Sequence, residues 1–244
     1  MLSPTWDLIV HPPLGGELNM AVDNWLFNNH PRPAFRLYGW QEPTISIGYR
    51  QKFRPPQRLK KLAERFPTVV RPTGGGYLLH TGDITFSIFF PKTHKFAQKP
   101  ILEFYAIVRD SFTRTARQLN LISGSKRGRG NSFAADCLAT PGRHEPVEGD
   151  RKWLATAQVK RRGATLQHGS IFWEEKSWPD NFKHTPYFLG TDNHVNRESF
   201  VNRLIKNISV DIFKGRFCNF YRLAPGEWQE ITESKKEFST EDFV

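Results

Sequence analysis

Apolar residues recur at helical spacing in several parts of the chain. Residues 17–28 are predicted to form an early amphipathic helix, and residues 100–119 a longer helix that turns one face toward the core. The apolar positions expected on that face are Ile101, Tyr105, Val108, Phe112 and Leu119. Shorter helices are predicted for residues 55–65, 197–207 and 226–238. The first of these opens with proline and is rich in polar residues, so it is expected to face solvent.

Runs of β-branched and aromatic residues predict the strands. Residues 34–40 and 44–49 have strand character on either side of the turn-like tripeptide Gln41-Glu42-Pro43, which predicts a β-hairpin. Residues 68–70 and 84–90 are further strand candidates of the same composition.

The segment 153–173 predicts two strands joined around Arg162-Gly163. Helices and strands follow one another without a regular strand–helix–strand alternation. This mixture favours the α+β class, with mixed, mostly antiparallel sheets flanked by helices. A length of 244 residues suits one domain over residues 1–244.

Three consecutive glycines, Gly74 to Gly76, lie between the predicted strands 68–70 and 84–90. Adjacent glycines cost backbone entropy, so they are expected where the chain needs a positive φ or where a ligand lies against the backbone. A tight loop beside a ligand and a simple hairpin turn both satisfy this pattern.

The composition indicates an ordered, aromatic-rich protein, with 20 Phe and 7 Trp. No apolar run approaches the roughly 18 residues of a membrane span. The first residues lack the basic start and apolar stretch of a signal peptide. We therefore expect a cytoplasmic protein that has no membrane partner.

The formal net charge of +11 indicates an acidic partner. Residues 227–244 hold six acidic and two basic side chains, so the rest of the chain carries about +15. Charge by itself does not distinguish an acidic protein from a nucleic acid.

Cys137 and Cys218 are too few for a disulfide framework and lack the spacing of a zinc site, so no metal site is predicted. Cys218 is assigned a structural role. Lys152 follows Cys137 by fifteen positions. A nearby ammonium stabilises a thiolate nucleophile, and a desolvated lysine can also relay its proton. The alternative is a small buried cysteine and an unrelated surface lysine.

Several separated segments resemble one family. They are NMAVD (19–23), PTISIGY (43–49), RPTGGGYLLH (71–80), RKWLATAQ (151–158) and LQHGSIFW (166–173). In this order they are similar to the lipoate-protein ligases and octanoyltransferases, over roughly residues 8–173. The resemblance implies a catalytic domain of the type shared with biotin ligases, which binds a medium-chain acyl group. Residues 174–244 are expected to form a C-terminal helical part of the same domain.

The resemblance also implies the site residues. Cys137 and Lys152 are the implied catalytic pair. The implied substrate-binding residues are Arg71, Gly74, Gly75, Gly76, Tyr77, His80, Ala155, Thr156, Ala157, His168 and Gly169. For the two histidines, a structural hydrogen-bonding role is as open as a direct contact with substrate.

Two chemistries occur in families of this kind. Ligases activate a free acid with ATP and Mg²⁺, and in that case Lys152 would stabilise adenylate phosphates together with Lys126, Arg127 and Arg129. Octanoyltransferases take octanoate from acyl carrier protein through a cysteine thioester and require no cofactor. Residues 137–158 align without a gap with the cysteine segment of such transferases, and they share Pro141, Glu145, Arg151, Lys152, Ala157 and Gln158 with it. The cysteine therefore favours transfer.

The implied partners of a transferase are octanoyl-acyl carrier protein and lipoyl-domain proteins, namely the glycine cleavage H protein and the E2 subunits of 2-oxoacid dehydrogenases. A third interpretation is a non-catalytic module that binds nucleic acid through Lys126–Arg129 and Lys160–Arg162. Charge runs are usually solvated faces, and most aromatic residues here have core spacing, so nucleic acid is not the expected partner.

The chain departs from the family pattern near the predicted site. A tyrosine at position 77 could narrow the acyl channel, and extra bulk at positions 155 and 156 could displace the strand that carries Lys152. The departing residues are Pro72, Tyr77, Thr81, Ala155 and Thr156.

Overall fold

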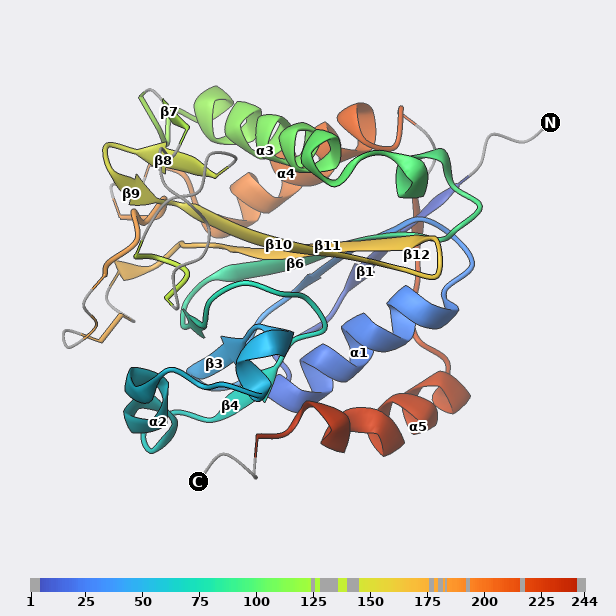
Figure 1. Cartoon of the computed structure of the whole chain (residues 1–244). Coiled ribbons are helices and arrows are strands. Elements are labelled where there is room, and N and C mark those ends of the chain that lie inside the picture. The colour runs from blue at the N-terminus through green and yellow to red at the C-terminus, as the bar shows by residue number, and fades with distance from the viewer. Residues whose placement is uncertain are drawn as a thin grey trace.

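A computed structural model gives the fold (Figure 1). It describes residues 5–240 except 124–125, 128–135, 140–144, 176–177, 180–181, 183, 192–193 and 216–217, and it describes only the backbone of residues 126–127. Within these residues the chain forms one large mixed sheet, two small sheets and helices on both faces of the large sheet (Figure 1).

The large sheet has six strands. In spatial order they are β10 (Leu154–Arg161), β11 (Ala164–Ile171), β6 (Ile84–Phe90), β2 (Ala34–Tyr38), β1 (Trp6–Val10) and β12 (Cys218–Phe220). The pairings from β10 to β2 are antiparallel, whereas β2–β1 and β1–β12 are parallel. The α+β class with mixed, mostly antiparallel sheets is confirmed.

Helices cover both faces of this sheet. The pair α3 (Ile101–Gln118) and α4 (Arg197–Asp211) lies on one face (Figure 1). Helix α1 (Gly16–Asn29) lies on the other face, and α5 (Pro225–Ser234) packs against α1. Successive side chains of a strand point to opposite faces of the sheet, so each face of the sheet packs against its own helices. Ile84, Phe86, Ile88 and Phe90 of β6 join the core cluster beneath α3 and α4, while Thr85 and Ser87 point to the side of α1.

Two three-stranded sheets complete the fold. One holds β4 (Thr68–Val70), β3 (Thr44–Ile47) and β5 (Leu78–His80), and the other holds β7 (Lys126–Arg127), β8 (Pro146–Glu148) and β9 (Arg151–Lys152). Short helical segments are α2 (Gln57–Ala63), η1 (Tyr49–Lys52), η2 (Lys95–Gln98) and η4 (Lys235–Phe238).

Three local predictions need correction. The predicted hairpin of residues 34–49 is wrong, because β2 belongs to the large sheet and β3 to a small one. The hairpin-turn alternative for the glycine run is wrong, because the run joins β4 to β5, which lie on opposite sides of β3. In α3, Val108 and Phe112 are buried as predicted, but Ile101 is 44% exposed and Phe104, which was not predicted, lies on the buried face.

The C-terminal part of the chain contributes to the same core as the rest. Leu204 and Ile208 of α4 belong to one hydrophobic cluster with Trp6, Phe86 and Phe112. Among the described residues, no helix is both long and apolar enough to cross a bilayer.

Candidate active site

A cavity of about 300 Å³ opens between the glycine run, strand β10 and the facing strand β11. This volume is at the lower end of the range typical of small-ligand sites. Twelve of the thirteen residues predicted from the sequence line it: Arg71, Gly74, Gly75, Gly76, His80, Cys137, Lys152, Ala155, Thr156, Ala157, His168 and Gly169. Residues far apart in the sequence thus meet in one place.

The buried side chain of Arg71 lies within the glycine loop and is hydrogen-bonded to its backbone. Its Nη2 donates to the carbonyl oxygens of Gly74 and Gly76, each at 2.7 Å, and Nη1 donates to the carbonyl and hydroxyl oxygens of Ser46. The remaining donor, Nε, lies 3.2 Å from Oγ1 of Thr73. All five N–H groups of the guanidinium therefore have acceptors in the protein. This points to a role for Arg71 in shaping the loop and supplying positive charge.

Gly75 is the member of the run that needs to be glycine. Its φ is +97°, a backbone conformation that side chains disfavour, and an added Cβ would lie 2.9 Å from Nη2 of Arg71. Gly48 lies directly against it, since a Cβ on Gly48 would be 2.1 Å from the carbonyl oxygen of Gly75. Glycine at both positions lets the two backbones meet.

Tyr77 is the predicted residue that does not line the cavity. Its ring is buried in a cluster with Ile47, Leu59 and Leu79, so it does not narrow an acyl channel as the sequence suggested. Its carbonyl oxygen instead accepts a hydrogen bond from the backbone N–H of Cys137 at 3.0 Å. Tyr77 thereby fixes the position of the cysteine.

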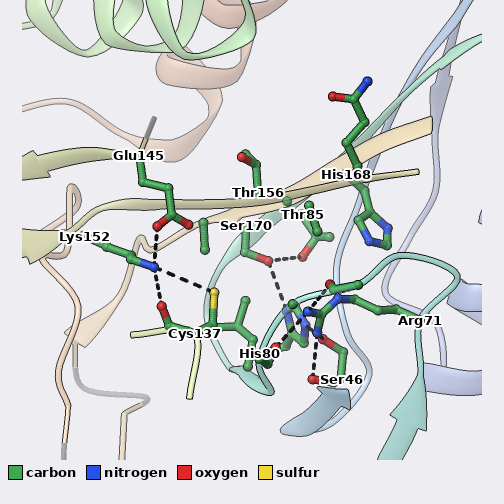
Figure 2. A pocket seen from close by; sticks show the side chains of 18 of the residues that line it. Ser46, Arg71, His80, Thr85, Cys137, Glu145, Lys152, Thr156, His168 and Ser170 are labelled. Atoms are coloured by element: carbon green, nitrogen blue, oxygen red, sulfur yellow. Dashed lines mark hydrogen bonds and ion pairs between the residues drawn. The ribbon is translucent and has the colours of Figure 1, made fainter. Parts of the chain in front are cut away.

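Cys137, Lys152 and Glu145 form a compact cluster at one end of the cavity (Figure 2). Nζ of Lys152 lies 4.0 Å from Sγ of Cys137 and 2.6 Å from Oε2 of Glu145, and it also donates to the carbonyl oxygen of Cys137. All three contacts converge on one buried ammonium group. The sequence alignment included Glu145 but gave it no role.

The charges in this cluster oppose one another. Burial raises the pKa of the Cys137 thiol, and the positive charges of Lys152 and Arg71 only partly offset this, while Glu145 adds to it. Burial also disfavours the Lys152 ammonium, but Cys137 when it is ionised and the Glu145 carboxylate outweigh that cost and raise the pKa of Lys152. The resting site therefore holds a neutral thiol beside a charged lysine.

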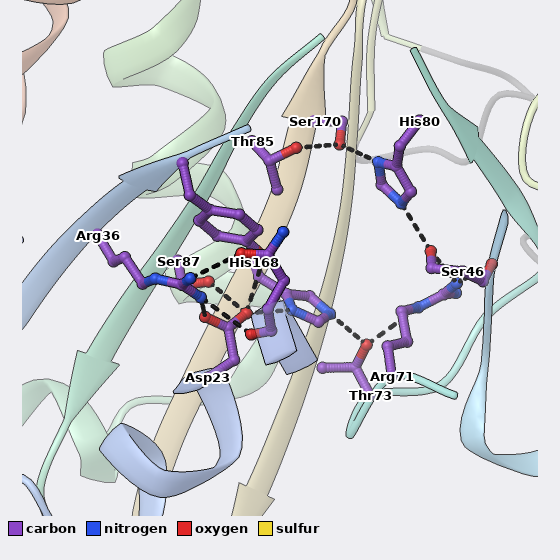
Figure 3. Close-up of polar contacts among 12 residues, drawn as sticks. Asp23, Arg36, Ser46, Arg71, Thr73, His80, Thr85, Ser87, His168 and Ser170 are labelled. Atoms are coloured by element: carbon purple, nitrogen blue, oxygen red, sulfur yellow. Dashed lines mark hydrogen bonds and ion pairs between the residues drawn. The ribbon is translucent and has the colours of Figure 1, made fainter. Parts of the chain in front are cut away.

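Each predicted histidine lies between an aspartate and a hydroxyl. Figure 3 shows His168 between Asp23 and Thr73, and the contacts of His80 with Ser46 and Ser170. His168 links Asp23 at 3.1 Å to Thr73 at 2.7 Å. His80 links Asp83 at 3.0 Å to the hydroxyl of Ser46 at 2.8 Å.

The donors in these chains can be assigned from the aspartates. A carboxylate only accepts, so the ring nitrogen that faces Asp23 or Asp83 carries the proton and donates it. The other nitrogen of a neutral imidazole then accepts from the hydroxyl of Thr73 or Ser46, whose oxygen in turn accepts from Arg71. Because both nitrogens of each ring are engaged, the hydrogen-bonding role is the better supported of the two that the sequence left open.

Asp23 anchors one chain from helix α1. Its fully buried carboxylate accepts from Arg36, Tyr38 and Ser87 as well as from His168. Burial opposes the charge, yet Arg36 together with these hydrogen bonds lowers the pKa of Asp23. The carboxylate thus stays ionised beneath the cavity, a feature that the sequence analysis missed.

Ala155 and Thr156 do not displace their own strand, β10, and Lys152 lies outside that strand, on β9. Both lie in regular register with β11, Ala155 opposite Ser170 and Thr156 opposite Gly169. A Cβ on Gly169 would lie 2.3 Å from the carbonyl oxygen of Ala155 and 2.8 Å from the Thr156 methyl carbon. Glycine at 169 thus makes room for the larger residues on β10.

Some predictions concern residues that the structure leaves undescribed. Arg129, named for the ligase alternative, and Pro141 of the cysteine segment lie outside the described residues, as do the side chains of Lys126 and Arg127. Tyr105 of α3, predicted as core, is half-buried and lines the cavity. In the described part of the chain, no group of three or more His, Cys, Asp or Glu side chains is arranged to hold a metal ion.

Comparison with known proteins shows the family of the chain. A family model described as the lipoyl protein ligase A/B catalytic domain matches residues 16–208. The chain belongs to this family. The match covers the glycine loop, Cys137, Lys152 and both histidines.

Curated relatives are about one third identical to this chain over the aligned residues. Octanoyltransferase LipM of Kyrpidia tusciae is 33% identical over 180 residues, which cover 68% of this chain and 65% of the relative. Octanoyltransferase LipM of Halalkalibacterium halodurans is 32% identical over the same shares. The chain thus spans just under two thirds of the length of these relatives.

Solved structures share the fold. A lipoate-protein ligase A bound with ATP has a TM-score of 0.73 at 18% identity, covering 97% of this chain and 95% of the other. A bipartite lipoate protein ligase of Thermoplasma acidophilum gives 0.67 at 16% identity, covering 96% and 93%. Biotin protein ligase of Leishmania major gives 0.52 at 9% identity, covering 97% and 82%. The predicted kinship with biotin ligase domains is confirmed for the fold.

Proposed function

We propose that this protein is an octanoyltransferase that moves an octanoyl group from acyl carrier protein to a lysine of a lipoyl-domain protein through a thioester on Cys137. The observation that carries the proposal is the 4.0 Å approach of Lys152 Nζ to Cys137 Sγ inside the cavity. The names of the curated relatives support it.

The first half-reaction is a thioester exchange. Sγ of Cys137 attacks the carbonyl carbon of the octanoyl thioester, a new S–C bond forms, and the bond to the carrier thiol breaks. The thiol proton of Cys137 ends on the departing carrier thiol. Lys152 is already an ammonium, so it can relay the proton only by giving one of its own protons to the departing carrier thiolate and taking up the Cys137 proton in its place. Its contacts with Glu145 and the cysteine suit it to this exchange.

The second half-reaction forms the amide. The amine of the acceptor lysine attacks the carbonyl carbon of the Cys137 thioester, the S–C bond breaks, and the thiolate takes up the proton that the amine releases. The positive charges of Lys152 and Arg71 favour the thiolate as leaving group. Burial of the thioester in the cavity keeps water away from it.

The proposed reaction requires neither nucleotide nor metal, because a thioester is already activated. Its partners are octanoyl-acyl carrier protein and the lipoyl domains of the glycine cleavage H protein or of 2-oxoacid dehydrogenase E2 subunits, and its expected location is the cytoplasm. The alternative is an ATP- and Mg²⁺-dependent lipoate ligase. The observation in its favour is the structural likeness to an ATP-bound ligase.

Intact mass spectrometry tests the proposal. The wild type, incubated with octanoyl-acyl carrier protein and no ATP, is expected to gain one octanoyl group that hydroxylamine removes. Cys137→Ala should gain nothing, and the matched variant Cys218→Ala should react like the wild type, because Cys218 lies on β12 at the other edge of the sheet. Modification of a lipoyl domain that requires ATP and survives Cys137→Ala would instead identify a ligase.

A further inference from the structure

Positive charge is concentrated on the segment of residues 49–65, which comprises η1, α2 and their connection. Seven basic side chains of this segment are exposed, against one acidic side chain, Glu64. The basic residues are Arg50, Lys52, Arg54, Arg58, Lys60, Lys61 and Arg65. We call this segment the basic rim.

These charges are not neutralised by the fold. Within the described residues, none of the seven basic side chains of the basic rim forms an ion pair. Other cations of the protein do have carboxylate partners, such as Arg36 with Asp23 and Arg114 with Asp211. An uncompensated cluster of this kind attracts an acidic surface and speeds its association.

The basic rim also exposes aromatic surface. Tyr49 is 54% exposed and Phe53 is 68% exposed, and their ring centroids lie 5.6 Å apart in an edge-to-face contact. Arginine and aromatic residues are the types most enriched where proteins bind one another. If this segment were only a solvated charged surface, exposed aromatic rings would not be expected on it.

The basic rim is attached to the wall of the cavity. The backbone N–H of Tyr49 donates to the carbonyl oxygen of Thr73 at 2.8 Å, and Gly48 packs against Gly75 of the glycine loop. On the inner side, Leu59 and Leu62 of α2 pack in the same cluster as Tyr77, whose carbonyl oxygen holds Cys137. A partner bound here is therefore held at a fixed place relative to the nucleophile.

We infer that the basic rim is the docking surface for the acidic carrier protein that delivers the acyl thioester. This inference rests on the proposed function and adds the surface by which the donor is recognised. The cavity lining includes Gly74, Gly75 and Cys137 but no residue of 49–65. A docking surface one layer outside the cavity suits a donor whose thioester is carried on a long prosthetic arm.

The acceptor has a different requirement. A lysine side chain reaches only the length of its four-carbon stem. The lipoyl domain must therefore sit directly over the cavity mouth, where Gly74 and Gly75 are exposed. This difference in reach assigns the basic rim to the donor.

Charge reversal combined with two kinds of donor tests the inference. The variant Arg54→Glu/Arg58→Glu is compared with Arg203→Glu/Lys206→Glu, which reverses two exposed charges on α4, on the opposite face of the large sheet (Figure 1). Acylation of Cys137 is measured with octanoyl-acyl carrier protein and with the octanoyl thioester of N-acetylcysteamine, a small neutral donor.

The variant in the basic rim is expected to lose about tenfold or more in kcat/KM with the carrier protein and to keep its rate with the small donor. The steep fall of the wild-type rate with added salt should become shallow in this variant. The α4 variant should match the wild type with both donors. Transfer from the preformed Cys137 thioester to a lipoyl domain should be the same in all three proteins.

Other results would overturn the inference. Equal losses of acylation by the carrier protein in both variants would show that only the net charge of the protein matters. A loss confined to transfer onto the lipoyl domain would assign the basic rim to the acceptor. Binding of a nucleic acid that the variant abolishes, with unchanged acylation by the carrier, would assign it to a nucleic acid. If the wild type is acylated by neither donor, the proposed function fails instead, which is a different outcome from normal acylation of the variant.

Discussion

At the scale of single residues, the reactivity of the site depends on three charges around one thiol. Glu145 holds Lys152 at 2.6 Å, so the ammonium that would stabilise a thiolate is shared with a carboxylate. Burial and Glu145 raise the pKa of Cys137, whereas Lys152 and Arg71 lower it. Such a site keeps the cysteine protonated at rest, and the negative charge of Glu145 contributes to this.

This balance predicts opposite effects for two substitutions. Glu145→Gln removes a negative charge near the thiol, so the pKa of Cys137 should fall and alkylation by iodoacetamide should begin at lower pH than in the wild type. Lys152→Met removes the stabilising cation, so alkylation should begin at higher pH. The measurement is the rate of Cys137 alkylation as a function of pH, followed by peptide mass spectrometry.

Cys218 reacts in the same samples and serves as the internal reference, because it lies on β12, at the far edge of the sheet from β10. Its pH dependence should be unchanged in both variants. Shifts of the Cys137 profile in the same direction for both variants would contradict the assigned charges.

At the scale of elements, the glycine loop is a structure built around a buried arginine. Arg71 closes it from within, and two chains of hydroxyl, imidazole and carboxylate connect that guanidinium to Asp23 and Asp83. A buried charge is tolerated when every donor is satisfied and carboxylates lie nearby. The loop shape that faces the cavity therefore depends on residues from α1, β3, β5 and β11.

Two neighbouring glycines should respond differently to the same change. Gly75→Ala places a side chain at φ +97° and against Arg71, which should cost about 1–2 kcal/mol of unfolding free energy. Gly74→Ala places its Cβ in open space, so its stability should match the wild type. Thermal unfolding followed by circular dichroism would show a Tm lower by a few degrees for the first variant only.

Equal Tm values for the two variants would show that the loop tolerates a side chain at residue 75 and that its positive φ does not constrain the sequence.

At the scale of the whole molecule, the C-terminal segment is built into the core that supports the site. Strand β12 extends the large sheet beside β1, and α4 packs against α3 over the same face. Core residues of α4 and its end therefore complete the layer that buries Phe86 and Phe112, namely Phe200, Leu204, Ile208 and Ile212.

We predict that the chain unfolds as one unit over residues 1–244. Tryptophan fluorescence reports on the buried Trp6 and Trp153, and far-ultraviolet circular dichroism reports on the helices, so the two urea transitions should coincide. A truncated chain of residues 1–173 should fail to fold cooperatively, because it leaves the apolar face of α3 uncovered. Two separate transitions in the full chain would divide it into domains.

The elements that the sequence predicted well are those with strong periodicity or turn chemistry. The predicted helix of residues 100–119 corresponds to α3, and the strands joined at Arg162-Gly163 are β10 and β11, whose turn has positive φ at both residues. The predicted hairpin of residues 34–49 failed because pairing partners are chosen by packing between distant segments. Local pattern shows that β2 and β3 are strands and leaves open which sheet each one joins.

The sequence by itself determined the family, the α+β class and twelve of the thirteen predicted residues that line the cavity, because local motifs fix which side chains are available for chemistry. Only the tertiary structure showed that the ring of Tyr77 lies away from the cavity. It also showed that every N–H group of the Arg71 guanidinium is hydrogen-bonded within the protein, and that Glu145 forms an ion pair with Lys152. These facts depend on distances between segments that are remote in the chain. Such distances are set by how the sheets and helices pack, and they cannot be read from local residue types and spacing.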